Sequence, residues 1–150
     1  MKVFLEAIQA KIMEVEAIPY VDEDWGQLDD YSPNYPVKWP CCLIDLQGAS
    51  FSDTGMQRNA SPENRQEATA TVTLVFANQK LTNGSGRAPL SQKQATWLIH
   101  DIIEAAHKLL HGWRPVEPHG KLVRTGQRKI RRDDGVQMHQ VIYTVGLHNV

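Results

Sequence analysis

At 150 residues, the chain has the length of one ordinary domain and can bury a single hydrophobic core. Its hydrophobic fraction of 41% lies far from the disordered range, and 16 basic against 17 acidic residues exclude a strong field that would attract nucleic acid or membrane. No apolar run approaches the ~20 residues of a transmembrane helix, and the N-terminus has no secretory signal pattern. The composition therefore predicts one soluble, cytoplasmic domain over residues 1–150.

The first forty residues predict a helix followed by a long polar loop. Apolar residues recur at helical spacing within 2–16, and Pro19 ends this amphipathic pattern. The apolar positions are Phe4, Leu5, Ile8, Ile12 and Val15. The stretch 19–40 is rich in Asp, Pro, Tyr and Trp, which is typical of a functional or interface loop in a small domain.

Two strands are predicted in the middle of the chain. Residues 41–46 have the composition of a short buried strand, in which Cys41 and Cys42 point to opposite faces, so an intrachain disulfide is not expected. We interpret both thiols as buried and unreactive. Residues 67–76 alternate apolar and polar side chains, as in a half-buried antiparallel strand with threonines on its exposed face. The intervening residues 48–65 have the composition of a mobile loop.

The best-specified element is a second helix that ends before Pro115. Ser91 is the expected N-cap, Gln94 completes a capping box, and Leu90 is expected to staple against the following turn. Gly112 stands where a left-handed residue commonly ends a helix. The core-facing stripe is formed by Ala95, Leu98, Ile99, Ile102, Ala106, Leu109 and Leu110.

The C-terminal part predicts a hairpin and completes the fold class. Residues 121–132 and 136–147 flank Asp134-Gly135, a strong signal for a tight turn between strands. The elements together predict an α+β fold with an antiparallel or mixed sheet of about four strands. Two helices are expected on one face of this sheet, and long loops connect the elements.

A polar stripe on the second helix is a candidate metal site. His100, Glu104, His107 and His111 follow one another at spacings that place them on one helical face. However, their order does not match His-Glu-x-x-His, and a single helix rarely supplies a complete ligand shell. We favour a solvated polar face supported by a Glu104–Lys108 pair, so no cofactor is predicted, and a metal-binding module is kept as an alternative.

One basic cluster suggests either nucleic acid or a protein contact. It consists of Arg128, Lys129, Arg131 and Arg132. Direct nucleic-acid binding is not favoured, because Asp133 and Asp134 neutralise part of the charge and no aromatic platform follows. We interpret the cluster as a solvated hairpin tip or as a charged rim that contacts the acidic segment 22–30, and a nucleic-acid-associated module remains an alternative.

That acidic segment belongs to a loop that is also rich in aromatic residues. Trp25, Tyr31, Tyr35 and Trp39 either anchor an interface or cover the core of their own domain. The acidic residues give no rigid general acid–base geometry, and the sequence contains no nucleophile elbow, phosphate-binding glycine loop or zinc framework. We therefore predict a protein without enzymatic activity. The candidate interface residues are Asp22, Asp24, Trp25, Asp29, Tyr31, Tyr35, Arg128, Lys129, Arg131 and Arg132.

The layout resembles the tail-terminator and tail-completion proteins of long-tailed phages and prophages. The segments that carry the resemblance are residues 36–44, the alternating strand 67–76, the helix end 109–113 and the last strand 140–147. Together they follow the family's order of helix, strands with long loops, helix and closing hairpin.

The resemblance implies a structural protein that works by self-association. Members of this family form rings, commonly hexameric, that cap the tail tube and provide the surface to which the head joins. The expected partners are copies of the chain, tail-tube proteins and head-completion proteins, with no membrane. Assembly is expected in the host cytoplasm, and the product is part of the virion tail. An acidic loop meeting a basic hairpin tip is the kind of unlike pair that a head-to-tail ring contact needs.

Overall fold

The computed structural model describes residues 1–29 and 36–149, which contain two α-helices and five β-strands. In chain order the elements are α1 (Lys2–Ile12), β1 (Tyr20–Glu23), the short 3-10 helix η1 (Gln27–Asp29), β2 (Cys41–Met56), β3 (Asn64–Gln79), α2 (Leu90–Leu110), β4 (Val123–Ile130) and β5 (Val136–His148). The α+β class predicted from the sequence is confirmed.

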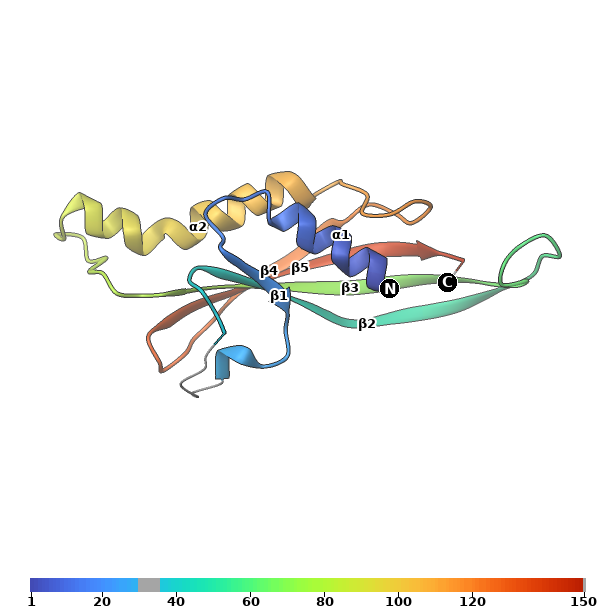
Figure 1. The fold of residues 1–150 in the computed structure, drawn as a ribbon, viewed down its shortest axis with the longest axis horizontal. Helices are drawn as coiled ribbons and strands as arrows, with labels where there is room; N and C mark the ends of the chain where they lie inside the picture. The colour runs from blue at the N-terminus through green and yellow to red at the C-terminus, as the bar shows by residue number, and fades with distance from the viewer. Residues whose placement is uncertain (30–35, 150) are drawn as a thin grey trace.

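The five strands form one sheet in the order β1-β2-β3-β5-β4 (Figure 1). β1 runs parallel to β2, and every other neighbouring pair is antiparallel. The prediction of about four strands missed β1, because only four residues of the polar stretch 19–40 join the sheet, beginning at the pair Tyr20↔Cys41.

Both helices cover the same face of the sheet and enclose the main core (Figure 1). The predicted apolar stripe of α1 is buried or half-buried there, and Tyr143 of β5 is the largest fully buried side chain. The alternating face of β3 is confirmed as the inner one. Its buried residues are Ala68, Ala70, Val72, Leu74 and Phe76.

The other face of the sheet has a smaller apolar cluster at the end where β2 begins. Leu28 of η1 and Val37 are buried in this cluster, and Trp39 packs against it half-buried. Cys41 belongs to the same cluster whereas Cys42 lies in the main core, so the prediction that the two thiols face opposite sides is confirmed. Part of the 19–40 stretch therefore covers its own sheet, as one of the two interpretations of its aromatic residues anticipated.

The outer face of β3 carries the threonines, as predicted. Thr69 is exposed and Thr71 is half-buried, whereas Thr73 is buried. Both helices lie on the opposite face of the sheet. This outer face therefore stays open along most of its length, and small polar side chains line it.

The prediction of a mobile loop over 48–65 is wrong for most of this range, because only residues 57–63 lie outside the strands. β2 and β3 continue through this region as a paired antiparallel hairpin, which we call the arm, and it projects from the right-hand end of the molecule in Figure 1. Register shifts occur between Leu46 and Gly48 and between Asp53 and Gly55. Ser, Thr and Gly are common in loops, but here cross-strand backbone hydrogen bonds override that local preference.

The predicted cap of α2 is also wrong. The helix begins at Leu90 after Pro89, and no side-chain hydrogen bond caps it, so Ser91 lies inside the first turn. Leu90 and Ala95 are both exposed and form no staple, whereas the rest of the predicted stripe is buried or half-buried. Gly112 has a φ of 77°, which confirms the left-handed residue after the helix.

Candidate assembly surface

The predicted acidic and basic segments meet within one chain. Arg132 Nη2 donates to the carbonyl oxygen of Leu28 and to Asp29 Oδ1, at 2.9 Å in each case, and to Asp134 Oδ2 at 2.6 Å. The hydrogen bond between Arg132 and Asp134 is the main cause that raises the pKa of the first and lowers the pKa of the second. The contact fastens η1 to the β4–β5 turn, so Asp29 and Arg132 are engaged inside the subunit.

The remaining residues of the basic cluster lie at the surface. Arg128 Nε donates to Gln140 Oε1 on the neighbouring strand at 2.7 Å. Lys129 pairs in register with His139, and its side chain is exposed, as is that of Arg131. These three side chains are available to a partner, whereas Arg132 is not. A charge reversal at Arg132 would therefore break contacts within the subunit.

The acidic residues near the end of β1 are organised by local hydrogen bonds. Asp22 Oδ2 accepts from the Tyr20 hydroxyl at 2.9 Å, and Asp24 Oδ1 accepts from the Gly26 backbone N–H at 3.0 Å. Trp25 is 57% exposed, so it covers no core of its own domain and can contact a partner. Tyr31 and Tyr35 lie outside the described residues.

A buried glutamine shapes this turn, and sequence analysis missed it. Gln27 is fully buried; its Nε2 donates to the carbonyl oxygen of Glu23 at 2.9 Å, and its Oε1 accepts the backbone N–H of Trp25 at 2.9 Å. Glutamine is usually exposed, so no pattern in the sequence marked it. By satisfying these backbone groups, Gln27 holds Trp25 at the surface.

The histidine stripe of α2 stays together only in part: the ring centroids of His107 and His111 lie 4.8 Å apart, and each of these rings also has a partner outside the helix. His107 Nδ1 lies 3.2 Å from the Tyr143 hydroxyl, and His111 Nδ1 accepts the backbone N–H of Arg124 at 3.2 Å. His100 instead lies beside His139 on β5, with ring centroids 5.1 Å apart.

The fourth member of the stripe, Glu104, pairs with Lys108 at 3.0 Å, as the solvated-face interpretation expected. No three His, Cys, Asp or Glu side chains converge as metal ligands within 1–29 and 36–149.

The vicinal thiols are held in their protonated form. Burial raises the pKa of Cys41 to about 12 and also raises the pKa of Cys42. This supports the interpretation of both as small buried side chains. Neither helix of the described chain is long and apolar enough to cross a membrane.

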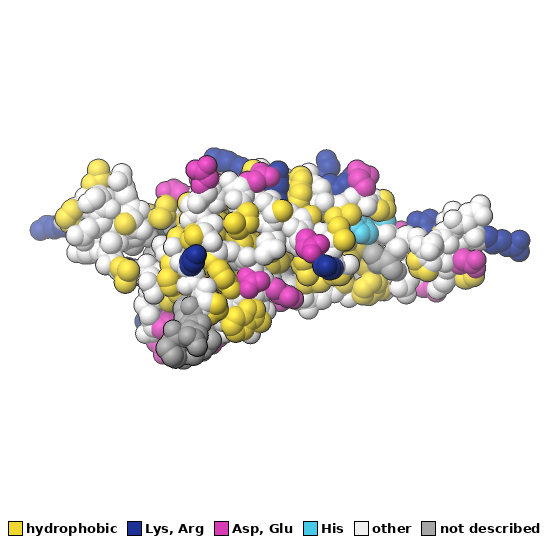
Figure 2. All heavy atoms as spheres, viewed as in Figure 1, with side chains coloured by type: hydrophobic (Ala, Val, Ile, Leu, Met, Phe, Trp, Pro, Cys, Tyr) yellow, Lys and Arg dark blue, Asp and Glu magenta, His cyan; other side chains and the backbone are white. Residues whose placement is uncertain are grey.

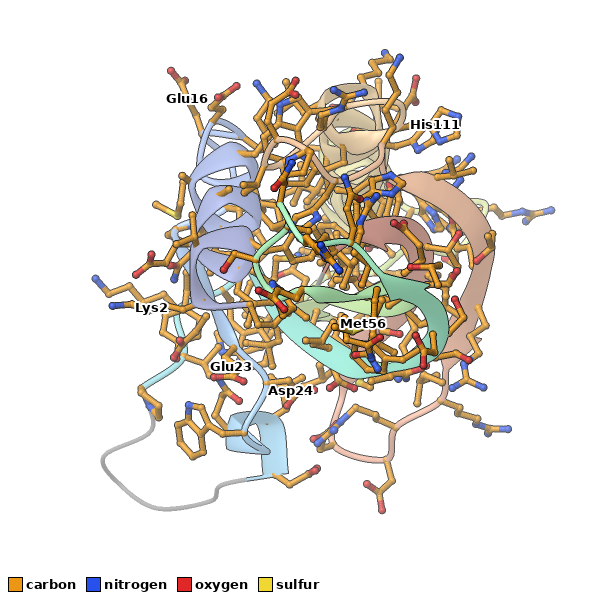
Figure 3. All side chains as sticks on the ribbon, turned by 90° about the vertical axis from the view of Figure 1, so that its right-hand side faces the viewer. Lys2, Glu16, Glu23, Asp24, Met56 and His111 are labelled. Atoms are coloured by element: carbon orange, nitrogen blue, oxygen red, sulfur yellow. The ribbon has the colours of Figure 1, made fainter. Side chains whose placement is uncertain are left out.

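A groove runs between α1 and the outer edge of β1. It has a volume of about 330 Å³. Its apolar lining comes from Leu5 and Ile44, and its acidic lining comes from Glu6, Asp22 and Glu23. Figure 3 shows Lys2, Glu23 and Asp24 along this side of the molecule. Sequence analysis did not predict the groove, because it did not predict β1.

The comparisons with known proteins find similarity in structure and none in sequence. No protein-family model matches the chain, and no curated protein matches it. Among solved structures, the fold is similar to a chain from a structure described as the virion of a native gene transfer agent particle, with a TM-score of 0.51 and 10% sequence identity. The similarity covers 91% of this chain and 84% of the other. At this identity the match establishes a shared fold over nearly the whole length.

Proposed function

We propose that this protein is a structural component of a phage-derived particle and acts as a tail terminator. The observation that carries the proposal is the similarity in fold to a chain from a gene transfer agent virion, over 91% of the present chain. A virion chain of the same fold acts through contacts with other particle proteins, so self-association and docking are the proposed activities, with no reaction catalysed.

The surface of the molecule suits this role. The arm and the outer face of the sheet expose small polar side chains together with Phe51 and Met56, which are 54% and 71% exposed. A long projecting hairpin of this kind buries little apolar surface within its own subunit, and contacts with neighbouring subunits can stabilise it. We propose that copies of the chain close into a ring, commonly hexameric in tail terminators, that caps the tail tube and presents a surface for the head.

Deletion of the gene in a particle-producing host tests the proposal. We expect tails of irregular length and heads that fail to join, both visible by negative-stain electron microscopy, and recovery when the wild-type gene is restored. Tails of normal length joined to heads in the deletion strain would refute the terminator role. An antibody against the protein should label particles at the junction between head and tail.

A further inference from the structure

The N-terminal half of α2 projects past the end of the sheet (Figure 1), and Gln137 of β5 contacts it by donating from Nε2 to the carbonyl oxygen of Thr96 at 3.1 Å. In Figure 1 this half, in yellow, extends past the left-hand end of the sheet. Three large apolar side chains are exposed on it and on the segment that leads to it: Leu81 at 82%, Leu90 at 69% and Trp97 at 53%. We call residues 79–97 the overhang.

All charged residues of the overhang are basic. Residues 79–97 include Lys80, Arg87 and Lys93 and contain no Asp or Glu. None of the three forms an ion pair with a described residue, although Lys93 Nζ donates to the carbonyl oxygen of Gly86 at 3.2 Å. Figure 2 shows a basic group at the tip of this end of the molecule and hydrophobic side chains near it. Apolar area surrounded by one sign of charge is typical of a protein-binding surface.

Local packing holds the overhang in a defined shape. The hydroxyls of Thr82 and Thr96 lie 2.7 Å apart, and the Asn83 backbone N–H donates to Gln92 Oε1 at 3.2 Å. A Cβ atom at Gly84 would lie 2.6 Å from the Thr96 methyl carbon, so glycine permits this close approach. A surface that is already ordered loses less conformational entropy when it binds.

The groove between α1 and β1 has the complementary character. Its lining combines the apolar Leu5 and Ile44 with three carboxylates and one lysine, so it is net acidic. No ion pair joins the groove to the overhang within the described chain.

We infer that the overhang of one copy docks into the α1–β1 groove of the next copy. The two surfaces lie at different places on the molecule, so each copy can use both at once in a head-to-tail contact. An apolar side chain of the overhang enters the groove, while Lys80 and Arg87 face Glu6 and Glu23. This inference deepens the proposed function, because it names the contact through which the ring grows.

The test is charge-swap complementation with two double variants. The overhang variant carries Lys80→Glu and Arg87→Glu, and the groove variant carries Glu6→Lys and Glu23→Lys. All four side chains are exposed, so both variants should fold, which circular dichroism verifies. We expect wild type to assemble at high concentration and each variant to sediment as a monomer. A 1:1 mixture of the variants should regain the wild-type sedimentation coefficient, because each overhang again meets a groove of opposite charge.

A matched control carries the same charge change elsewhere. Lys108→Glu with Lys121→Glu alters two exposed residues outside both surfaces and outside the arm, and this variant should assemble like wild type. A second, uncharged change, Leu81→Ser with Leu90→Ser, should weaken self-association by about tenfold or more, since it removes apolar area from the contact. The inference is overturned if wild type stays monomeric at every concentration, if both charge variants assemble alone, or if their mixture stays monomeric.

The two proposals can fail separately. If the variants assemble normally and the deletion strain still lacks terminated tails, the contact is wrong and the terminator role stands. If complementation succeeds but the deletion strain makes normal particles, the contact is right and the terminator role is wrong.

Discussion

β2 and β3 pass through two regions with opposite environments. Near the start of β2, Cys41–Ile44 are buried, and so is 72–77 of the paired β3. In the arm, the same two strands continue with Ser52–Met56 exposed. The ladder is continuous across the change, apart from its two register shifts. Strand pairing and burial are therefore separate properties here, because backbone hydrogen bonds maintain the arm after the core has ended.

The difference predicts two levels of local stability. The inner region is held by apolar burial on both faces of the sheet, whereas the arm depends on its ladder and on side-chain hydrogen bonds such as Thr54 Oγ1 to the Arg65 carbonyl oxygen at 2.8 Å. Regions with little apolar burial open at lower free energy than the core. The arm should exchange its amide hydrogens faster than the rest of the sheet.

The largest change in the free energy of unfolding is expected at a buried phenylalanine, and an exposed phenylalanine in the arm provides the comparison. Phe76 is 1% exposed on β3, and Phe51 is 54% exposed on β2 in the arm. Phe76→Ala should lower the free energy of unfolding by ~3–5 kcal/mol, because it leaves a cavity in the main core. Phe51→Ala should change it by less than ~0.5 kcal/mol. Urea unfolding of both variants measures the contrast, and equal losses would contradict it.

A smaller change in the free energy of unfolding is expected where Arg132 attaches η1 to the β4–β5 turn. Arg132→Ala removes the hydrogen bonds to the Leu28 carbonyl and to Asp29, so η1 loses its attachment to the β4–β5 turn. We expect a loss of about 1–2 kcal/mol, reduced from a buried pair because Asp29 is largely exposed. The neighbouring Arg131→Ala is the control and should be nearly silent in the same urea experiment.

Acid should weaken the helix-covered region and spare the arm. Burial is the main cause that lowers the pKa of His107 and of His139, and the charges of Arg124 and Lys129 add to it. Because the unfolded state then takes up protons first, stability is complete above pH ~6.5 and falls as pH drops toward the lowered folded pKa values. We expect a lower Tm at pH 5.5 than at pH 7.5.

A double variant isolates the histidine contribution. His107→Gln with His139→Gln should reduce the difference in Tm between the two pH values, even if its Tm at pH 7.5 is lower. Hydrogen exchange should show that acid increases exchange in α2 and β5 more than in the arm. A pH response of unchanged size in the variant would mean that other groups cause it.

The smallest change in the free energy of unfolding is expected for a substitution in the arm. Arg65 donates to Gln57 Oε1 at 2.9 Å in an exposed contact, and it lies 3.6 Å from Glu67 in a half-exposed ion pair. Arg65→Ala should leave the free energy of global unfolding within ~0.5 kcal/mol of wild type. Amide exchange in residues 52–66 should nevertheless increase, since local opening of the arm loses these contacts without unfolding the core.

Elements with strong local periodicity were predictable from the sequence. The stripe of α1, the alternation of β3 and the Asp134-Gly135 turn each combine several residues that favour the same structure. β1 was missed because four residues in a polar stretch carry no periodic signal, and its pairing with β2 depends on a contact that is distant in sequence. The arm was missed because Ser and Gly favour loops locally, while its strand form depends on the partner strand.

The sequence identified the charged segments of the candidate surface but only part of their spatial arrangement. Asp29 and Arg132 do meet, as the opposite charges of their segments suggested. They meet within one chain, however, because η1 lies against the β4–β5 turn. Charge content alone does not distinguish a contact within a subunit from one between subunits. The α1–β1 groove depends on the missed strand, so no sequence pattern could have placed it.

Adjacent thiols on opposite sides of one strand provide a built-in chemical reporter. Cys41 lies beneath the loop-covered cluster and Cys42 beneath the helices, and burial raises the pKa of both. Alkylation of either sulfur therefore requires its own covering layer to open. Fragmentation mass spectrometry after timed alkylation would show which thiol reacts first, and therefore which layer separates first, with no substitution in the protein.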